Sequence, residues 1–251
     1  MIHPPGKSLM DMTFVRLLPN IMTLGAICAG LTAIRFAMQG HYVGAVYLII
    51  LAAVLDGLDG RVARLVGSDS DFGAELDSLA DFLNFGVAPA LVLYFWGLQG
   101  MGSLGWSTVL AFALCCVLRL ARFNVQSRNA DSDTGGTHFT GVPAPAGALL
   151  ALAPMYLAFA FADRPYMPGF LLCAYLLFIG LLMTSRVATV SPKALRFSRD
   201  TLGLTVFCIL LVTAALVLFE WVTLVAMSAI YLAMVIKSLI SEFSKADADR
   251  I

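Results

Sequence analysis

The feature that most restricts this chain is a series of long apolar segments. An α-helix needs roughly 20 residues to cross the hydrocarbon core of a bilayer. Eight segments reach or approach that length: residues 17–38, 42–58, 80–98, 104–121, 144–162, 168–185, 202–219 and 221–240. Backbone polar groups in lipid must be satisfied within the segment, so each segment is predicted to be a helix. We therefore expect an all-α, polytopic membrane helix bundle with about eight transmembrane helices.

The overall composition supports this interpretation. Hydrophobic residues make up 60% of the 251 residues and charged residues only 13%, whereas soluble domains are about half apolar and a quarter charged. The formal net charge is zero, so no nucleic-acid partner is expected. The five cysteines all lie in apolar stretches without metal-ligand spacing, which favours buried hydrophobic roles. The first residues, 1–12, lack the continuous apolar core of a signal peptide.

Basic residues predict the orientation of the bundle. Of 16 lysines and arginines, 14 lie in one set of connections between the apolar segments, and only Arg35 and Arg164 lie in the other. The positive-inside rule makes the basic side cytoplasmic. With an even number of spans, both termini are then expected in the cytoplasm. The mixed segment 8–18 is read either as a short interfacial helix or as an unstructured lead-in.

Four carboxylates are predicted to meet where two segments extend past their apolar limits. The expected helices are 42–66 and 73–98, joined by a short connection that makes them antiparallel neighbours. Asp56 and Asp59 are three residues apart, and Asp77 and Asp81 are four apart, so each pair lies on one helical face. Each pair also lies near the cytoplasmic end of its helix. Acidic residues in membrane helices are costly and by default indicate a functional site.

Such a group of oxygen ligands suits a hard divalent cation. Unpaired carboxylates so close together repel each other, and all-oxygen sites suit Mg²⁺, Mn²⁺ or Ca²⁺ rather than Zn²⁺. Two such ions about 4 Å apart clamp a phosphate and activate a hydroxyl. The alternative is a carboxylate–arginine network that only holds the helices together. The nearby arginines are Arg61 and Arg64, and two of them do not balance four acids.

The same residues carry a resemblance to a known family. The segment 56–81 reads D-x2-D-G-x2-A-R-x8-G-x3-D-x3-D, and it is similar to the signature of the CDP-alcohol phosphatidyltransferases at every fixed position. The resemblance implies a six-helix catalytic core within residues 1–200, which includes the short N-terminal segment. Residues 201–251 would then add two transmembrane helices and a cytoplasmic tail. It also implies a CDP-linked lipid as donor, and leaves a homodimer plausible.

The resemblance assigns roles to individual residues. It implies that Asp56, Asp59 and Asp77 bind metal and that Asp81 is shared between metal binding and general-base catalysis. It also implies contacts with the CDP moiety from two groups of residues. The first comes from the signature: Gly60, Ala63, Arg64 and Gly73. The second, Asn20 and Thr23, lies at the start of the first span and resembles a shorter family element.

Three further stretches resemble the phosphatidylserine synthase branch of the family. They are residues 77–90, 119–125 and 139–146, and they imply L-serine as the acceptor, with CDP-diacylglycerol as the donor and phosphatidylserine and CMP as products. Serine needs a cationic partner for its carboxylate, which arginine can bind with two hydrogen bonds. The candidates for acceptor binding are Arg119, Arg122, Asn124, Arg186 and Lys193. For the four basic residues, ordinary anchoring at the membrane surface is the alternative.

These residues allow two roles for Asp81 and more than one acceptor. Asp81 either accepts the proton of the serine hydroxyl or only orients that hydroxyl. A phosphorylated acceptor, such as glycerol 3-phosphate or an inositol phosphate, would need a denser basic pocket, for which residues 186–199 hold four cations. A divalent-cation transporter is the alternative from another class, although its acids should lie at mid-bilayer. In a bacterial host, the protein is expected in the plasma (inner) membrane with its active site facing the cytoplasm.

Overall fold

The computed structural model describes residues 9–67, 70–130, 141–161, 167–185 and 202–248. All regular structure in these residues is helical. The first two elements are α1 (Leu9–Met38) and α2 (Tyr42–Val66), and α3 (Asp71–Asp81) leads into η1 (Phe82–Val87), α4 (Ala88–Leu93), η2 (Tyr94–Leu98) and η3 (Gln99–Met101). The remaining helices are α5 (Gly102–Ala130), α6 (Ala144–Ala151), α7 (Ala153–Phe161), α8 (Gly169–Thr184), α9 (Leu202–Leu218) and α10 (Glu220–Ala248).

The helices confirm the predicted membrane bundle. Six helical stretches of the described chain are long and apolar enough to cross a bilayer: 17–38, 42–66, 71–101, 103–126, 144–161 and 220–241. The apolar helix α8 has 16 residues and α9 has 17, at or below the lower limit for a span. The count of eight therefore stays a prediction. Residues 9–18 are the first part of α1, so they are not an unstructured lead-in. The candidate span begins at residue 17, and an interfacial position of the preceding residues stays a prediction.

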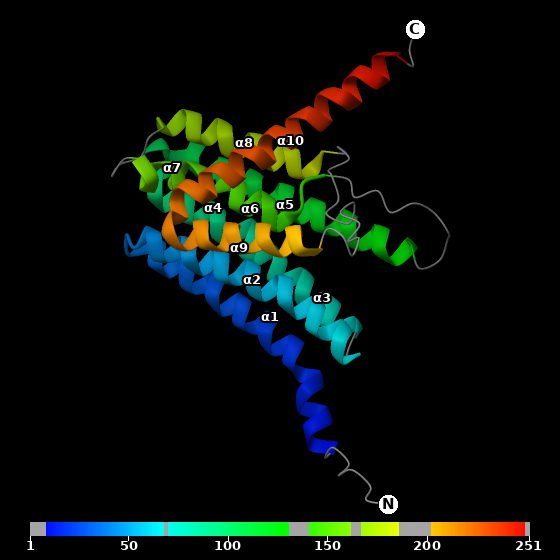
Figure 1. The fold of residues 1–251 in the computed structure, drawn as a ribbon. Helices are drawn as coiled ribbons and strands as arrows, with labels where there is room; N and C mark the ends of the chain where they lie inside the picture. Colours follow the sequence, from blue (N-terminus) through cyan, green and yellow to red (C-terminus); the bar gives the residue numbers. More distant parts are fainter. Residues whose placement is uncertain (1–8, 68–69, 131–140, 162–166, 186–201, 249–251) are drawn as a thin grey trace, which may run out of the picture.

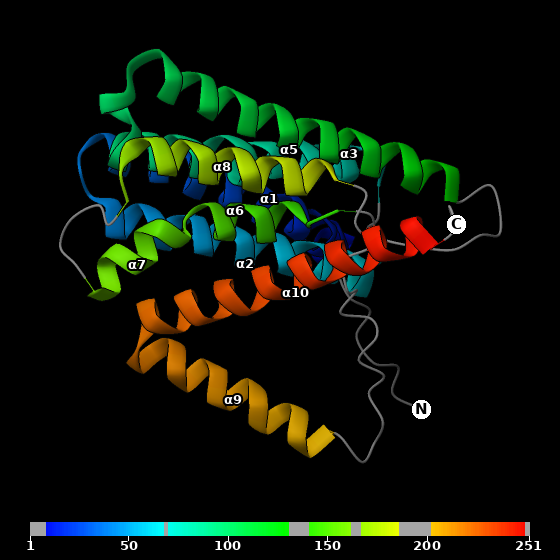
Figure 2. The same cartoon turned by 90° about the horizontal axis from the view of Figure 1, so that it is seen from above.

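The helices run back and forth along one axis (Figures 1 and 2). α1 and α2 are antiparallel neighbours with small residues in their contact, among them Ala26, Ala29 and Ala52. Small residues allow close approach of membrane helices, whose association depends on packing. The connection between α2 and α3 lies at the same end of the bundle as the C-terminal ends of α5, α8 and α10 (Figure 2). This end is called the acidic end below.

Two irregular helices are explained by prolines. Pro89 follows the π-helical segment η1 and lacks the N–H that would bond to the carbonyl of Phe85 in a regular helix. Pro154 separates α6 from α7 and in the same way leaves the carbonyl of Leu150 without its helical donor. The hydroxyl of Tyr175 on α8 donates to that carbonyl at 2.6 Å. A donor from a neighbouring helix thus replaces the bond that the proline removes.

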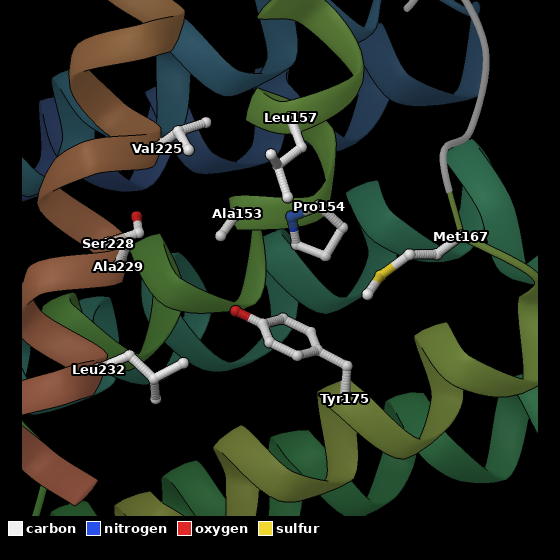
Figure 3. Close-up of a pocket in the computed structure, with 9 residues that line it drawn as sticks. All are labelled: Ala153, Pro154, Leu157, Met167, Tyr175, Val225, Ser228, Ala229 and Leu232. Atoms are coloured by element: carbon white, nitrogen blue, oxygen red, sulfur yellow. The ribbon is translucent and has the colours of Figure 1, made fainter. Parts of the chain in front are cut away.

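The C-terminal helices pack on the outside of the bundle. α9 contacts mainly α10, and α10 crosses α7 (Figure 2). Near the start of α10, Glu220 accepts a hydrogen bond from the Tyr47 hydroxyl at 2.7 Å, and Trp221 packs against Phe159 with ring centroids 4.8 Å apart. An apolar cavity of about 170 Å³ lies between α7, α8 and α10. Figure 3 shows the nine residues that line it, and none of them is acidic.

Candidate active site

Three of the four predicted carboxylates converge at the acidic end. Asp56 lies on α2, and Asp77 and Asp81 lie on α3, which runs antiparallel to it. One carboxylate oxygen from each residue lies within 4.8 Å of the others. All three side chains are half-buried. The helical spacing read from the sequence therefore does bring acids from two helices to one point.

Asp59 lies beside this group and is held differently. Its side chain is 4% exposed, and its Oδ2 accepts a hydrogen bond from the Thr23 hydroxyl on α1 at 2.6 Å. The carbonyl of Pro19 lies 3.1 Å from the same hydroxyl. A hydroxyl has one proton, so the shorter contact with the carboxylate is its donated bond. Asp59 is thus tied to α1, whereas Asp56, Asp77 and Asp81 face one another.

The donor set fits a hard divalent cation. Its three ligands are carboxylates, with no histidine or cysteine among them, and oxygen ligands of this kind suit Mg²⁺ or Mn²⁺. The three acids bring three negative charges into a half-buried site. Among the described residues, Arg119 on α5 interacts electrostatically with Asp81, and its single positive charge offsets only part of this negative charge. A bound cation would remove the remaining repulsion.

The residues assigned to the CDP moiety surround the same point. Asn20 is on α1, and its Oδ1 would lie 3.3 Å from a Cβ atom on Gly73 in the first turn of α3. A side chain at Gly73 would therefore press on Asn20 and on the helix cap. That cap is Ser70, whose Oγ accepts a hydrogen bond from the N–H of Gly73 at 3.1 Å. The turn of α1 that holds Asn20 and the first turn of α3 thus meet closely.

The end of α2 supplies the other assigned residues. Apart from the adjacent backbone of α2 and the two chain neighbours, no heavy atom of the described residues lies within 4 Å of a Cβ placed on Gly60, so this face of α2 has room for a ligand. Ala63 is half-buried and Arg64 is exposed. Arg64 donates its Nε hydrogen to the carbonyl of Gly60 at 3.0 Å. Four of its five N–H groups are not used in this bond.

Three of the five acceptor-binding candidates lie on α5 at the same end. Arg119 donates to the carbonyl of Val142 at 2.6 Å, and Arg122 donates to the carbonyl of Thr184 at 2.8 Å. Asn124 donates to the Ser78 hydroxyl on α3 at 2.9 Å. The other two candidates, Arg186 and Lys193, lie outside the described residues. The arginines therefore connect α5 to the residues before α6 and to the end of α8, which surface anchoring alone would not require.

Two residues beside the site were not singled out from the sequence. Ser78 connects α3 to α5 through Asn124, and Asn84 is fully buried in η1, one turn beyond Asp81. Both lie in the stretch 77–90 that resembles the serine-using branch. The other sequence signal for each was a polar residue within an apolar span.

Comparison with known proteins agrees with this arrangement. A family model described as CDP-alcohol phosphatidyltransferase matches residues 16–185. A CDP-diacylglycerol–serine O-phosphatidyltransferase of Mycobacterium tuberculosis (strain ATCC 25618 / H37Rv) is 39% identical over 217 residues, which cover 84% of this chain and 76% of that protein. The protein of the same name from Helicobacter pylori (strain ATCC 700392 / 26695) is 34% identical over 201 residues, or 80% of this chain and 81% of that protein. The protein of the same name from Mycobacterium leprae (strain TN) is 45% identical over 177 residues, which cover 69% of this chain and 58% of that protein.

Proposed function

This chain belongs to the CDP-alcohol phosphatidyltransferase family, and from that premise we propose that it transfers the phosphatidyl group of CDP-diacylglycerol to L-serine. The products are phosphatidylserine and CMP. The observation that carries the proposal is the convergence of Asp56, Asp77 and Asp81 from two helices, within the segment that the family model matches. The relatives named as serine O-phosphatidyltransferases support serine as the acceptor.

In the reaction, the serine hydroxyl oxygen forms a bond to the phosphorus that carries diacylglycerol. The bond from that phosphorus to the oxygen bridging to CMP breaks, and CMP leaves with the bridging oxygen. Asp81 accepts the hydroxyl proton or orients the hydroxyl for attack. Arg64, at the open end of α2, pairs with phosphate oxygens of the CDP moiety. These side chains act mainly by positioning and by electrostatic stabilisation, as in other phosphoryl transfers.

The cofactor is a divalent cation, and we propose a two-metal site that takes Mg²⁺ or Mn²⁺. Asp56, Asp77 and Asp81 would hold it, with Asp59 contributing the oxygen that Thr23 does not occupy. When bound, the ions supply positive charge for the phosphate oxygens and acidify the attacking hydroxyl. The protein's own contribution is a half-buried cluster whose carboxylates come from rigid helices.

The acceptor is proposed to bind between α3 and α5. Arg119 and Arg122 each use one N–H group for a backbone carbonyl and have further donors for the serine carboxylate. Asn124 supplies a donor and an acceptor beside them, and Arg186 and Lys193 remain candidates. Asn20, Thr23, Gly60, Ala63 and Gly73 are proposed to surround the CDP moiety on the opposite side, between α1, α2 and α3.

The protein is an integral membrane protein, and its placement is part of the proposal. In the sequence, 14 of 16 lysines and arginines belong to the set of connections that includes the one between α2 and α3, so we assign the acidic end and both termini to the cytoplasm. In a bacterium, the membrane would be the plasma (inner) membrane. Residues 1–200 would form the catalytic core, and residues 201–251 would add two peripheral helices. Homodimer formation is a further part of the proposal.

A direct assay tests this function. Purified full-length protein is incubated with CDP-diacylglycerol and Mn²⁺ or Mg²⁺, and CMP release is measured with serine, glycerol 3-phosphate or inositol phosphate in separate reactions. We expect release only with serine, lost on addition of a chelator. Asp81→Asn should abolish turnover while binding of the CDP-lipid remains detectable. Release only with a phosphorylated acceptor would reject serine, and near-normal turnover by Asp81→Asn would reject its assigned role.

A further inference from the structure

A fully buried amide lies three residues after Asp81, on the helical run that carries two acids of the cluster. Asn84 is 0% exposed, and neither its Oδ1 nor its Nδ2 has a hydrogen-bond partner among the described residues. Leaving a buried polar group unpaired costs about 1–3 kcal/mol, and in a membrane span water cannot compensate from outside. Such a residue needs an explanation other than packing, since leucine would fill the same volume at lower cost.

The two ends of this amide are not equivalent. A Cβ atom on Gly30 of α1 would collide with Oδ1 of Asn84, so this oxygen faces the Cα hydrogens of Gly30. A Cα–H group is a weak donor and suits a carbonyl oxygen, but it gives nothing to an NH₂ group. The orientation with Oδ1 toward Gly30 is therefore the chemically sensible one. Nδ2 is left as a donor that needs an acceptor elsewhere.

An unpaired acceptor lies one turn away on the same helical run. Oδ1 of Asp81 is buried and also has no partner among the described residues. Asp81 and Asn84 are three residues apart across the junction of α3 and η1, a spacing that makes side chains neighbours on a helix. An unpaired buried donor and an unpaired buried acceptor are thus three residues apart on one helical run that includes the cluster.

We propose that Asn84 is a positioning residue for Asp81. Its amide N–H group supplies, directly or through one bound water, the hydrogen bond that holds the inner oxygen of the Asp81 carboxylate. This bond would set the rotation of the carboxylate and so aim its other oxygen at the cation. Residues that orient metal ligands in this way commonly change metal affinity by about 10- to 100-fold when they are replaced. The inference rests on the proposed function for the role of Asp81.

Substitution of Asn84 separates this role from a packing role. Asn84→Leu removes the amide and keeps a similar volume, and Asn84→Ser keeps a hydroxyl donor. Thr108→Val is the matched control, because Thr108 is also a buried polar residue (2% exposed) whose hydroxyl bonds within α5, away from the acids. Each full-length variant is purified, and its thermal unfolding is followed during titration with Mn²⁺ alone. The Mn²⁺-dependent stabilisation gives the apparent cation affinity without any measurement of turnover.

We expect Asn84→Leu to fold with a melting temperature near or above that of the wild type in the absence of cation. Its apparent Mn²⁺ affinity should fall at least tenfold, that of Asn84→Ser should fall less, and that of Thr108→Val should not change. If Asn84→Leu is stabilised and binds Mn²⁺ as the wild type does, the residue has no positioning role and the inference is wrong. If Asn84→Leu does not fold, Asn84→Ser and the Gly30 variant below still decide.

Gly30 provides an independent test from another helix. Gly30→Ala would push the amide of Asn84 out of its position, so it should weaken Mn²⁺ binding although it changes no polar group. In the Asn84→Ser background the added methyl group meets a shorter side chain, and Gly30→Ala should have a smaller effect. Equal effects in both backgrounds would contradict the proposed contact.

Two measurements together separate this inference from the proposed function. Serine-dependent CMP release by the wild type tests the function, whereas the Mn²⁺ titrations test Asn84. A wild type that releases no CMP with serine, together with weaker Mn²⁺ binding by Asn84→Leu, would reject the function and keep the positioning role. Serine-dependent CMP release by the wild type, together with unchanged Mn²⁺ binding by the variants, would support the function and reject the positioning role.

Discussion

Replacing Thr23 with valine tests how Asp59 is held in the membrane. The substitution keeps the shape of the side chain and removes the hydroxyl that donates to Asp59 at 2.6 Å. Because Asp59 is 4% exposed, water does not readily replace the lost donor. We expect Thr23→Val to destabilise the protein and to weaken cation binding, since the freed carboxylate loses the contact that ties it to α1.

The structure sets the expected size of this effect. Hydrogen bonds between helices in membrane proteins contribute about 0.6 kcal/mol on average, whereas hydrogen bonds to charged groups contribute about 1.5–3 kcal/mol. The second range applies here, because the acceptor is a buried carboxylate and the contact is short. With roughly 2–4 °C per kcal/mol for a chain of this size, the melting temperature should fall by about 3–12 °C.

Thermal unfolding of the purified full-length protein without cation measures this difference. Thr23→Ser retains a hydroxyl and should recover most of the stability. Thr32→Val is the matched control, since Thr32 lies on the same helix and its hydroxyl bonds only to the carbonyl of Cys28 in an exposed position. A loss of about 0.6 kcal/mol or less for Thr23→Val, or an equal loss for Thr32→Val, would refute the argument that the charged acceptor sets the magnitude.

Further predictions concern the cluster and the supports around it. Asp77→Asn should remove most of the Mn²⁺-dependent stabilisation and lower CMP release at least about 100-fold, because one of three converging ligands loses its charge. Mn²⁺ titrations that match those of the wild type would argue against a metal-binding role for Asp77. Tyr175→Phe should cost about 1–3 kcal/mol in thermal unfolding, since the carbonyl of Leu150 loses the donor that replaces the missing proline N–H; an unchanged melting temperature would contradict this. Gly141→Ala should destabilise the protein by at least about 1 kcal/mol, because Gly141 has φ +91° and a Cβ would lie 2.8 Å from the carbonyl oxygens of Met183 and Ser185. Gly100→Ala is the control: a Cβ at Gly100 would meet open space, so its thermal unfolding should be nearly unchanged. Ser70→Ala removes the side-chain cap of α3 and should lower the free energy of unfolding by about 1 kcal/mol. Thermal unfolding measures this loss, and Ser70→Asp, which keeps a capping oxygen, should restore the stability.

Much of the architecture was predictable because bilayer physics acts on local sequence. Apolar length predicted spans at 17–38 and 144–162, close to the candidate spans 17–38 and 144–161, and a helix at 168–185, close to α8. The prediction that 42–66 extends past its apolar limit as one helix is also confirmed. The break between α6 and α7 and the π-helical turn in the third span were not predicted. Both accompany prolines inside apolar segments, where the missing N–H must be compensated by a neighbour that the sequence does not identify.

The sequence alone determined which residues can share a face. Helical periodicity puts Asp56 with Asp59 and Asp77 with Asp81, and the short connection between their helices makes the two pairs neighbours. These are local consequences of 3.6 residues per turn, so they can be read without a structure. The family signature rests on the same spacing.

Only the tertiary structure decided how these faces meet. It turns Asp59 toward Thr23, 36 residues away, and brings the other three acids together. It also places Asn84 against Gly30 and gives Arg119 and Arg122 their carbonyl partners. Each of these contacts depends on the rotation and axial register of one helix against another. Those quantities are set by side-chain packing across the whole bundle, and no single segment of sequence contains them.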